Sequence, residues 1–344
     1  MNSKHVLIVG SAKKTSLEKM YLRAFLSSGY PNTDLLNIES SRSSWSKNRI
    51  VNRLLPDLLK KWGEKELLNH LRINNDKYHY IIIFKGLQFT RKSLEKCRSI
   101  TPVSTWINIY TDDPYNFDSR AATNSNVVDS FSFFDAYCIW SKSIENRLRL
   151  DGCKKVIYLP FGYDVDHHRL CNTPTEGDPT LISFIGTWDR RREKLLAELK
   201  DYNIMIYGTR WENVKSTFPH KKNIVYKSVS GNEASCIMKK SAISLNPMRL
   251  QNQGAHNMRT FEIPAMGGLM LTNKTEEQQY FFPHNEACYM YTDIEDLKIT
   301  IDRILNNKDK ANIVRDKGIK VVIRHSYSNR VQSLIKELEE KSEF

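Results

Sequence analysis

Short apolar runs alternate with helical patterns along the chain, and this alternation limits the fold more than any other feature of the sequence. Strand-like runs in the first half lie at residues 6–9, 35–38, 80–84, 103–110, 136–140 and 156–159, and a second series begins at residues 181–185. Strands that alternate with helices favour parallel sheets with helices on both faces. At 344 residues the chain exceeds the usual size of one domain, so we expect two such α/β domains.

Ligands of such sheets bind beyond the carboxyl ends of the strands. Gly10, Lys85, Gly86 and Asp112 each follow a predicted strand of the first half, so we expect them to face one cleft. The turn after the first strand, GSAKKTS, lacks the second and third glycines of a dinucleotide fingerprint. This argues against a nicotinamide-dependent oxidoreductase.

Two adjacent carboxylates, Asp112 and Asp113, follow the strand that ends at Tyr110, and Pro114 comes next. Neighbouring carboxylates can raise one another's pKa, so one of the two can act as a general base for a substrate hydroxyl. A metal site is one alternative, although no third carboxylate stands nearby in the sequence. The other alternative is a carboxylate that only caps the turn before the proline.

The second half contains a predicted helix between two predicted strands, with strands at residues 242–245 and 268–272 and the helix at 257–266. A helix N-terminus offers unpaired N–H groups and partial positive charge, which suit a diphosphate. Arg249, His256 and Arg259 would add donors beside it.

Glu262, about one turn into this helix, can accept hydrogen bonds from two vicinal hydroxyls, as on a ribose. An ordinary helix that follows a solvated polar loop is the alternative.

Basic residues are concentrated in the first hundred positions, which hold 19 Lys and Arg against 8 Asp and Glu, a difference of +11 out of +13 for the whole chain. An anionic membrane, a phosphorylated lipid carrier or nucleic acid would suit this charge, and a solvated face with no partner is an equal alternative. Within residues 45–72, apolar residues recur at helical spacing among lysines and arginines. This pattern fits a helix that docks on a membrane or one that packs on the sheet.

The six cysteines form no CxxC pair and have no histidines at metal-ligand spacing, so structural zinc is not expected. Reduced thiols in a cytoplasmic protein are the simplest interpretation. No run of about 18 apolar residues occurs, which predicts a soluble protein or one that is peripheral at the inner face of the membrane.

The run NMRTFEIPAMGG at residues 257–268 resembles the C-terminal signature of glycosyltransferases with two Rossmann-like domains, and in particular the family of the spore maturation protein CgeB. Four further passages resemble the same family in their order and spacing: WINIYTDDP at 106–114, YLPFGYD at 158–164, FIGTWDRRRE at 184–193 and HSYSNR at 325–330. The order and spacing of the five passages extend the resemblance over nearly the whole chain.

The resemblance implies a GT-B fold, with two Rossmann-like parallel-sheet domains facing a central cleft and a C-terminal helix that crosses back to the first domain. We expect an acceptor-side domain at 1–165, a linker at 166–179, a donor domain at 180–325 and the crossover helix at 326–344. It also implies a nucleotide-diphospho-sugar donor, a glycan, lipid-linked or surface polysaccharide acceptor, and no metal cofactor.

Roles follow for the candidate residues. Asp112 or Asp113 would be the base if the reaction inverts, whereas a retaining reaction would not require one. His256 would assist at the diphosphate, and Gly10, Lys85 and Gly86 would lie on the acceptor side. The donor would be held by residues of the second domain, with Trp211 and Tyr226 either stacking on the base or serving as core aromatics. The predicted donor residues are Gly186, Thr187, Arg191, Trp211, Tyr226, Arg249, Asn257, Met258, Arg259 and Glu262.

The sequence departs from the better-known retaining members of this fold at one position. Those members carry two glutamates eight residues apart, and Glu262 matches the second, but the first falls on Gly254. This absence leaves the stereochemical course open and permits one alternative, a nucleotide-sugar-binding protein without catalysis. The basic first domain permits a second alternative, transfer of sugar onto nucleic acid.

Overall fold

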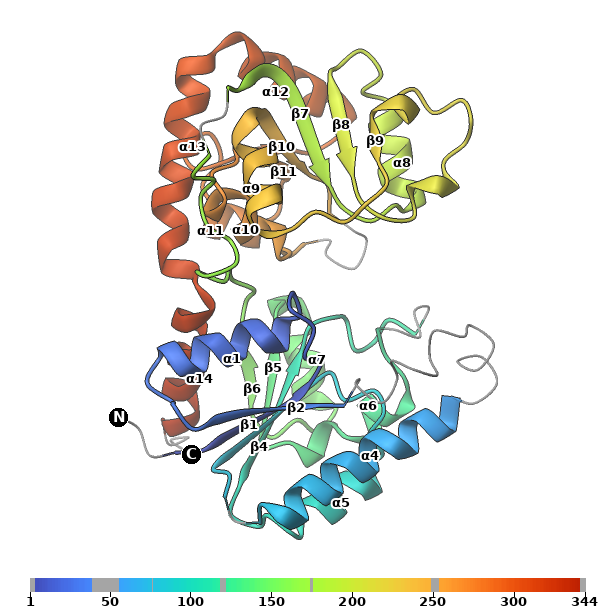
Figure 1. Cartoon of the computed structure of the whole chain (residues 1–344), viewed down its shortest axis with the longest axis vertical. Coiled ribbons are helices and arrows are strands. Elements are labelled where there is room, and N and C mark those ends of the chain that lie inside the picture. Colours follow the sequence, from blue (N-terminus) through green and yellow to red (C-terminus); the bar gives the residue numbers. More distant parts are fainter. Residues whose placement is uncertain are drawn as a thin grey trace. The chain divides into compact units, whose positions relative to one another are not determined.

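The computed structural model describes residues 4–38, 56–75, 77–117, 122–173, 176–248 and 254–340. The chain divides into a first unit, residues 1–160 with 327–344, and a second unit, residues 161–326. Each unit has, among the described residues, a six-stranded parallel sheet with helices packed on it (Figure 1). The predicted fold of two Rossmann-like α/β domains is confirmed.

The first unit has the strand order β2-β1-β3-β4-β5-β6. Its strands are β1 Val6–Gly10, β2 Thr33–Asn37, β3 Tyr80–Phe84, β4 Thr105–Tyr110, β5 Ala136–Ile139 and β6 Val156–Tyr158. Its helices are α1 Leu17–Ser27, α4 Pro56–Ile73, α5 Arg91–Arg98, α6 Ser125–Asp129, α7 Glu145–Leu150 and α14 Tyr327–Glu339.

The central strands of this sheet are continuous apolar runs because both of their faces are covered. Every residue of β1 (VLIVG) and β3 (YIIIF) is buried. Helices α4 and α5 lie over one face, and α1 and α14 lie over the other (Figure 1). Leu67 and Leu71 of α4 reach the core with no exposed surface.

The C-terminal helix α14 belongs to the first unit, in agreement with the predicted return of the chain. It packs on α1, where the rings of Tyr21 and Tyr327 lie 5.1 Å apart. The hydroxyls of Ser27 and Ser328 are 2.9 Å apart. These contacts join segments about 300 residues apart in the chain into one helical layer.

The second unit has the strand order β12-β11-β10-β7-β8-β9. Its strands are β7 Asp178–Ile185, β8 Ile204–Tyr207, β9 Ile224–Val225, β10 Ser241–Asn246, β11 Met270–Asn273 and β12 Tyr289–Tyr291. Its helices are α8 Arg190–Ala197, α9 Gly231–Lys240, α10 Arg259–Ala265, α11 Glu276–Phe281, α12 Ile294–Asn306 and α13 Lys308–Val322. The order reverses between β7 and β10, which is where a doubly wound sheet binds its ligand.

One prediction about the cysteines is wrong. Cys171 and Cys236 form a disulfide, although all six cysteines were expected to be reduced thiols. The two residues are 65 positions apart, and only the fold brings them together, so their spacing gave no signal. The other four cysteines are buried free thiols, and burial raises the pKa of Cys97 and Cys153 to about 12.

Candidate functional site

Two loops meet where the strand order of the second unit reverses. Gly186 and Thr187 follow β7, and Pro247 follows β10. Arg192 of α8 joins the two loops, because its Nη1 donates to the Thr187 carbonyl at 3.0 Å and its Nη2 to the Pro247 carbonyl at 3.3 Å. The predicted residues Gly186 and Thr187 therefore lie at the point where this sheet topology binds ligands.

The arginine that reaches these loops is not the one predicted. Asp189 caps α8 by accepting from the backbone N–H groups of Arg191 and Arg192, both at 3.0 Å. In this geometry the Arg191 side chain is exposed, whereas that of Arg192 is only 11% exposed. Arg190, Arg191 and Arg192 are consecutive, and consecutive helical residues point about 100° apart. Arg192 therefore returns over the loop, whereas Arg190 and Arg191 face solvent.

The loop after β7 is also held from β8. Trp211 is fully buried, and its indole N–H donates to the Gly186 carbonyl at 2.8 Å. A base cannot stack on a ring without exposed surface, so the predicted stacking role of Trp211 is contradicted and its alternative, a core aromatic, holds. Tyr226 is 51% exposed, and its predicted contact with a base stays a prediction.

Asparagines fix the start of α10 against the end of β10. Asn257 Oδ1 accepts from the backbone N–H of Thr260, in the first turn of α10, at 3.0 Å. Its amide also exchanges hydrogen bonds of 2.9 and 3.2 Å with the amide of Asn246, a residue that the sequence did not single out. Met258 is the N-cap residue of α10, and Arg249 falls outside the described residues.

Glu262 lies in α10 with its side chain only 7% exposed. Its Oε2 accepts from Arg259 Nη1 at 2.5 Å, and its Oε1 lies 3.6 Å from His168 Nε2. Two carboxylate oxygens together offer about four acceptor positions, so these contacts leave room for a hydroxyl donor. Glu262 and Arg259 belong to the predicted site residues, whereas His168 does not.

The neighbours of Glu262 counteract the effect that burial has on the pKa of its carboxyl group. Desolvation alone would raise the pKa of Glu262, but the Arg259 guanidinium, the two neighbouring histidines and the hydrogen bond from Arg259 outweigh it and hold that pKa below its ordinary value. Burial lowers the pKa of His168, although the Glu262 carboxylate acts in the opposite direction. At neutral pH the site therefore holds an ionised carboxylate beside a neutral imidazole.

His256 has a different place from the one predicted. It has no exposed surface, and its Nε2 accepts from the Phe161 backbone N–H at 3.1 Å. That bond puts the ring proton on Nδ1, which lies 2.6 Å from Glu277 Oε2. Both ring nitrogens are engaged in the core, and this contradicts the predicted contact of His256 with a diphosphate.

Gly254, at the position of the absent glutamate, has a φ of +86°. No atom of the described residues, its chain neighbours apart, lies within 4 Å of the place that a Cβ would take. A residue with a side chain would still be strained in this left-handed backbone, whereas glycine adopts it readily. The backbone at this position therefore suits glycine, and a carboxylate here would require a different conformation.

The predicted residues of the first unit lie at the carboxyl edge of its sheet. Gly10 ends β1, and Lys85 and Gly86 follow β3, on either side of the point where the strand order reverses. Lys85 forms an ion pair and hydrogen bond with Asp112, which follows β4. The topology thus brings residues of three strand ends to one edge.

Asp113 has a different environment from Asp112. Its Oδ1 accepts from the Tyr115 backbone N–H at 2.9 Å, which is the turn cap considered as an alternative from the sequence. Among the described residues, the side-chain cation Lys85 pairs with Asp112, while Asp113 caps the turn.

The basic segment 45–72 is described only from residue 56 onward. The burial of Leu67 and Leu71 favours the alternative in which this helix packs on its sheet. In the described parts of the chain, no helix is long and apolar enough to cross a membrane. The same parts contain no group of three or more His, Cys, Asp or Glu side chains placed to hold a metal ion.

Two kinds of comparison gave matches for this chain, namely a family match over residues 190–336 and solved structures with a similar fold. Residues 190–336 match the family described as Glycosyl transferase-like. No curated protein matches the chain at a significant level.

Similar solved structures cover both units. Sucrose-phosphate synthase from Thermosynechococcus elongatus aligns with a TM-score of 0.68 at 12% identity, over 97% of this chain and 99% of that one. HepE from Anabaena in complex with UDP-glucose aligns with a TM-score of 0.67 at 10% identity, over 98% of this chain and all 100% of the other.

TarM of S. aureus, in a complex that includes UDP and alpha-GlcNAc-glycerol, aligns with a TM-score of 0.58 at 10% identity over 80% of this chain. The alignment spans only 59% of the length of TarM. At such identities the likeness shows a shared fold. Residues 190–336 thus form a glycosyl transferase-like region, and the chain has the two-unit fold of the GT-B glycosyltransferases.

Proposed function

We propose that this protein is a glycosyltransferase that moves a sugar from a nucleotide-diphospho-sugar to an acceptor hydroxyl. The observation that carries the proposal is the buried carboxylate of Glu262 in α10, which pairs with Arg259 and lies 3.6 Å from His168 Nε2. Glu262 and Arg259 belong to the region 190–336 that matches the family described as Glycosyl transferase-like. HepE and TarM bind UDP or UDP-sugar on the same fold, which supports a donor of this class.

In this proposal Glu262 accepts hydrogen bonds from the ribose hydroxyls of the donor. The loops joined by Arg192, at the reversal point of the sheet, hold the rest of the nucleotide. Arg259 is 29% exposed on its side chain, so its guanidinium can reach a diphosphate while it also binds Glu262. Arg249, outside the described residues, stays a predicted donor to the diphosphate.

Sugar transfer develops positive charge at the anomeric carbon and negative charge on the leaving diphosphate. We propose that cationic side chains, rather than a metal, stabilise this leaving group. Asp112 acts as the base for the acceptor hydroxyl, and Lys85 orients that carboxylate. An inverting reaction needs a base for the acceptor hydroxyl, whereas a retaining reaction does not require one. The proposal that Asp112 is the base therefore includes an inverting reaction.

For the acceptor we propose a glycan, a lipid-linked sugar or a surface polysaccharide, and a place for the chain in the CgeB-like family, on the motifs that it shares with that family. TarM was crystallised with alpha-GlcNAc-glycerol and Fondaparinux, which supports a saccharide-type acceptor on this fold. The basic first hundred residues would suit an anionic acceptor or a membrane surface. Cytoplasmic residence belongs to this same proposal, although cytosolic thiols are usually kept reduced, so the Cys171–Cys236 disulfide would be an exception in that compartment.

The test is an assay of nucleoside diphosphate release. Wild-type protein is incubated with UDP-, GDP- and dTDP-sugars, with and without saccharide acceptors, and compared with Glu262→Gln and the control Glu295→Gln. Glu295 lies in α12 of the same unit with a side chain 73% exposed. We expect release with one donor, a strong loss in Glu262→Gln and none in the control. Equal turnover in all three proteins would refute the assigned donor site, and binding without any release would favour a non-catalytic binding protein.

A further inference from the structure

His168 belongs to a connecting segment, residues 161–173, that precedes β7 in the second unit. It is 4% exposed, and its Nδ1 accepts from the Asp164 backbone N–H at 3.0 Å. This bond leaves the ring proton on Nε2, which is the nitrogen 3.6 Å from Glu262 Oε1. The N–H of the imidazole therefore faces the proposed ribose-binding carboxylate at a distance slightly longer than a hydrogen bond.

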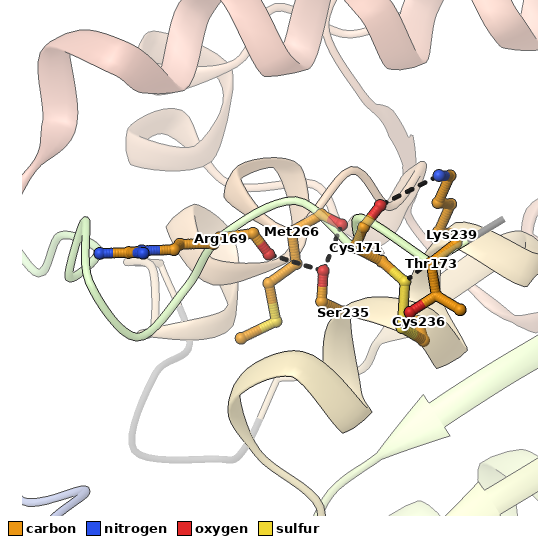
Figure 2. The surroundings of a disulfide bond; sticks show 7 residues. All are labelled: Arg169, Cys171, Thr173, Ser235, Cys236, Lys239 and Met266. Atoms are coloured by element: carbon orange, nitrogen blue, oxygen red, sulfur yellow. Dashed lines mark hydrogen bonds between the residues drawn. A yellow bond between two sulfur atoms is a disulfide. The ribbon is translucent and has the colours of Figure 1, made fainter.

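Helix α9 holds the connecting segment through three side chains (Figure 2). Ser235 Oγ donates to the Arg169 carbonyl at 2.6 Å, and Lys239 Nζ donates to the Cys171 carbonyl at 3.0 Å. Cys236 forms the disulfide with Cys171. Positions 235, 236 and 239 lie on one face of a helix, so the three contacts act on the same stretch of chain.

The same helix also contacts the element that carries Glu262. Ser235 Oγ lies 3.3 Å from the carbonyl oxygen of Met266, the residue that directly follows α10 (Figure 2). One helix thus fixes both the segment with His168 and the helix with Glu262. Among these contacts the disulfide is covalent, and it lies three residues after His168.

We propose that His168 is a positioning residue for Glu262 and that the Cys171–Cys236 disulfide keeps His168 in place. This rests on the proposed function, in which Glu262 binds the donor. A carboxylate that must receive two hydroxyls needs a fixed orientation, and side chains behind it supply that orientation. Arg259 holds one oxygen of Glu262 and His168 faces the other.

Two substitutions separate this role from a local structural one. In His168→Asn the amide oxygen can replace Nδ1 as the acceptor for Asp164, but the donor to Glu262 is lost. In His168→Gln the amide N–H can replace Nε2–H, but the acceptor for Asp164 is lost. Both variants are compared with wild type by urea unfolding, so that loss of fold is detected separately.

We expect His168→Asn to raise the KM for the nucleotide-sugar about tenfold with little change in kcat, and His168→Gln to raise it less than about threefold. If both variants keep the wild-type KM, or if His168→Gln has the higher KM of the two, the positioning role is overturned.

A second measurement needs no nucleotide. The His168 ring is titrated by NMR in the free protein, with its signal identified by its absence in His168→Gln. The groups that act on this ring are Glu262, His167, Asp164 and Arg259. We expect the pKa of His168 to fall further in Glu262→Gln, because the carboxylate that favours the charged ring is gone. An unchanged pKa would overturn the pairing, whereas an intact pairing without nucleotide binding would refute only the proposed function.

The disulfide is tested with dithiothreitol and with a Cys171→Ser/Cys236→Ser variant. Reduction breaks the S–S bond, and two electrons and two protons from the dithiol convert it into two thiols while dithiothreitol becomes its cyclic disulfide. We expect the KM of the reduced wild type and of the double variant to rise about threefold, and the double variant to be insensitive to dithiothreitol because its remaining cysteines are free thiols. A KM that is unchanged by reduction would overturn the role of the disulfide.

Discussion

Gly208 sits where the end of β8 approaches the loop after β7, and its replacement by alanine gives a prediction with a defined cause. A Cβ at Gly208 would lie 2.0 Å from the Gly186 carbonyl oxygen and 2.7 Å from its carbon. Both are backbone atoms, so no side-chain rotation can relieve the contact. Gly186 is the same residue whose carbonyl accepts the indole N–H of Trp211 at 2.8 Å.

The cost follows from this geometry. Carbon and oxygen that are not bonded need about 3.2 Å or more, so the backbone must move by about 1 Å. Overpacking of this kind costs about 1–3 kcal/mol, and loss of the buried hydrogen bond to Gly186 adds about 1 kcal/mol. We therefore expect Gly208→Ala to destabilise the second unit by about 3 kcal/mol.

Gly254→Ala provides the matched control, because its φ of +86° is left-handed but no described atom beyond its chain neighbours lies near the added Cβ. Alanine there should cost only about 1 kcal/mol, from backbone strain alone. Both variants are measured by urea unfolding, followed by tryptophan fluorescence, to which the buried Trp211 contributes, and by circular dichroism. For a unit of this size we expect the melting temperature of Gly208→Ala to fall by about 6–12 °C. If the two variants lose equal stability, the steric argument for Gly208 is refuted.

Three other substitutions test separate parts of the site. Asp112→Asn should lower kcat about a hundredfold or more with an unchanged donor KM, and full activity would exclude Asp112 as the base. Because the pKa of Glu262 is lowered by folding, its ionised form should stabilise the protein above about pH 4.3 and lose that effect as the pH falls through the folded pKa. The gap in urea midpoint between wild type and Glu262→Gln should therefore shrink from pH 7 to pH 3, and a constant gap would contradict this sign. His256→Leu should destabilise the protein by about 3 kcal/mol, because Phe161 N–H and Glu277 lose a buried partner, and a fully stable variant with reduced turnover would instead favour the catalytic role.

The strands could be predicted because buried parallel strands are continuous apolar runs. Segments such as YIIIF at β3 have few alternative structures, and each predicted strand of the first unit lies where β1 to β6 are found. Glu262 and Arg259 could be singled out because they belong to a motif that is local in sequence. Lys85 and Asp112 could be placed at one edge of the sheet because the carboxyl ends of parallel strands meet at the same edge. That argument needs only the order of the elements along the chain.

The rest of the site depends on contacts between distant segments. His168 reaches Glu262 from 94 positions earlier in the sequence, and Cys171 reaches Cys236 across 65 positions, so no local pattern identifies either pair. Whether Arg191 or Arg192 reaches the loop after β7 depends on the direction in which α8 leaves its cap, Asp189. Trp211 and His256 carry the right chemistry for a ligand site, but their burial, which the sequence does not display, assigns them to the core.

The most direct test of the proposed donor site is isothermal titration calorimetry with UDP, GDP, dTDP and CDP on wild type, Glu262→Gln and the control Glu295→Gln. We predict that wild type and the control bind one of these nucleotides with equal affinity. Glu262→Gln should bind it at least tenfold more weakly, because a charge-assisted bond to the ribose is lost. Equal affinity in all three proteins, or no binding of any nucleotide by the wild type, would contradict the account.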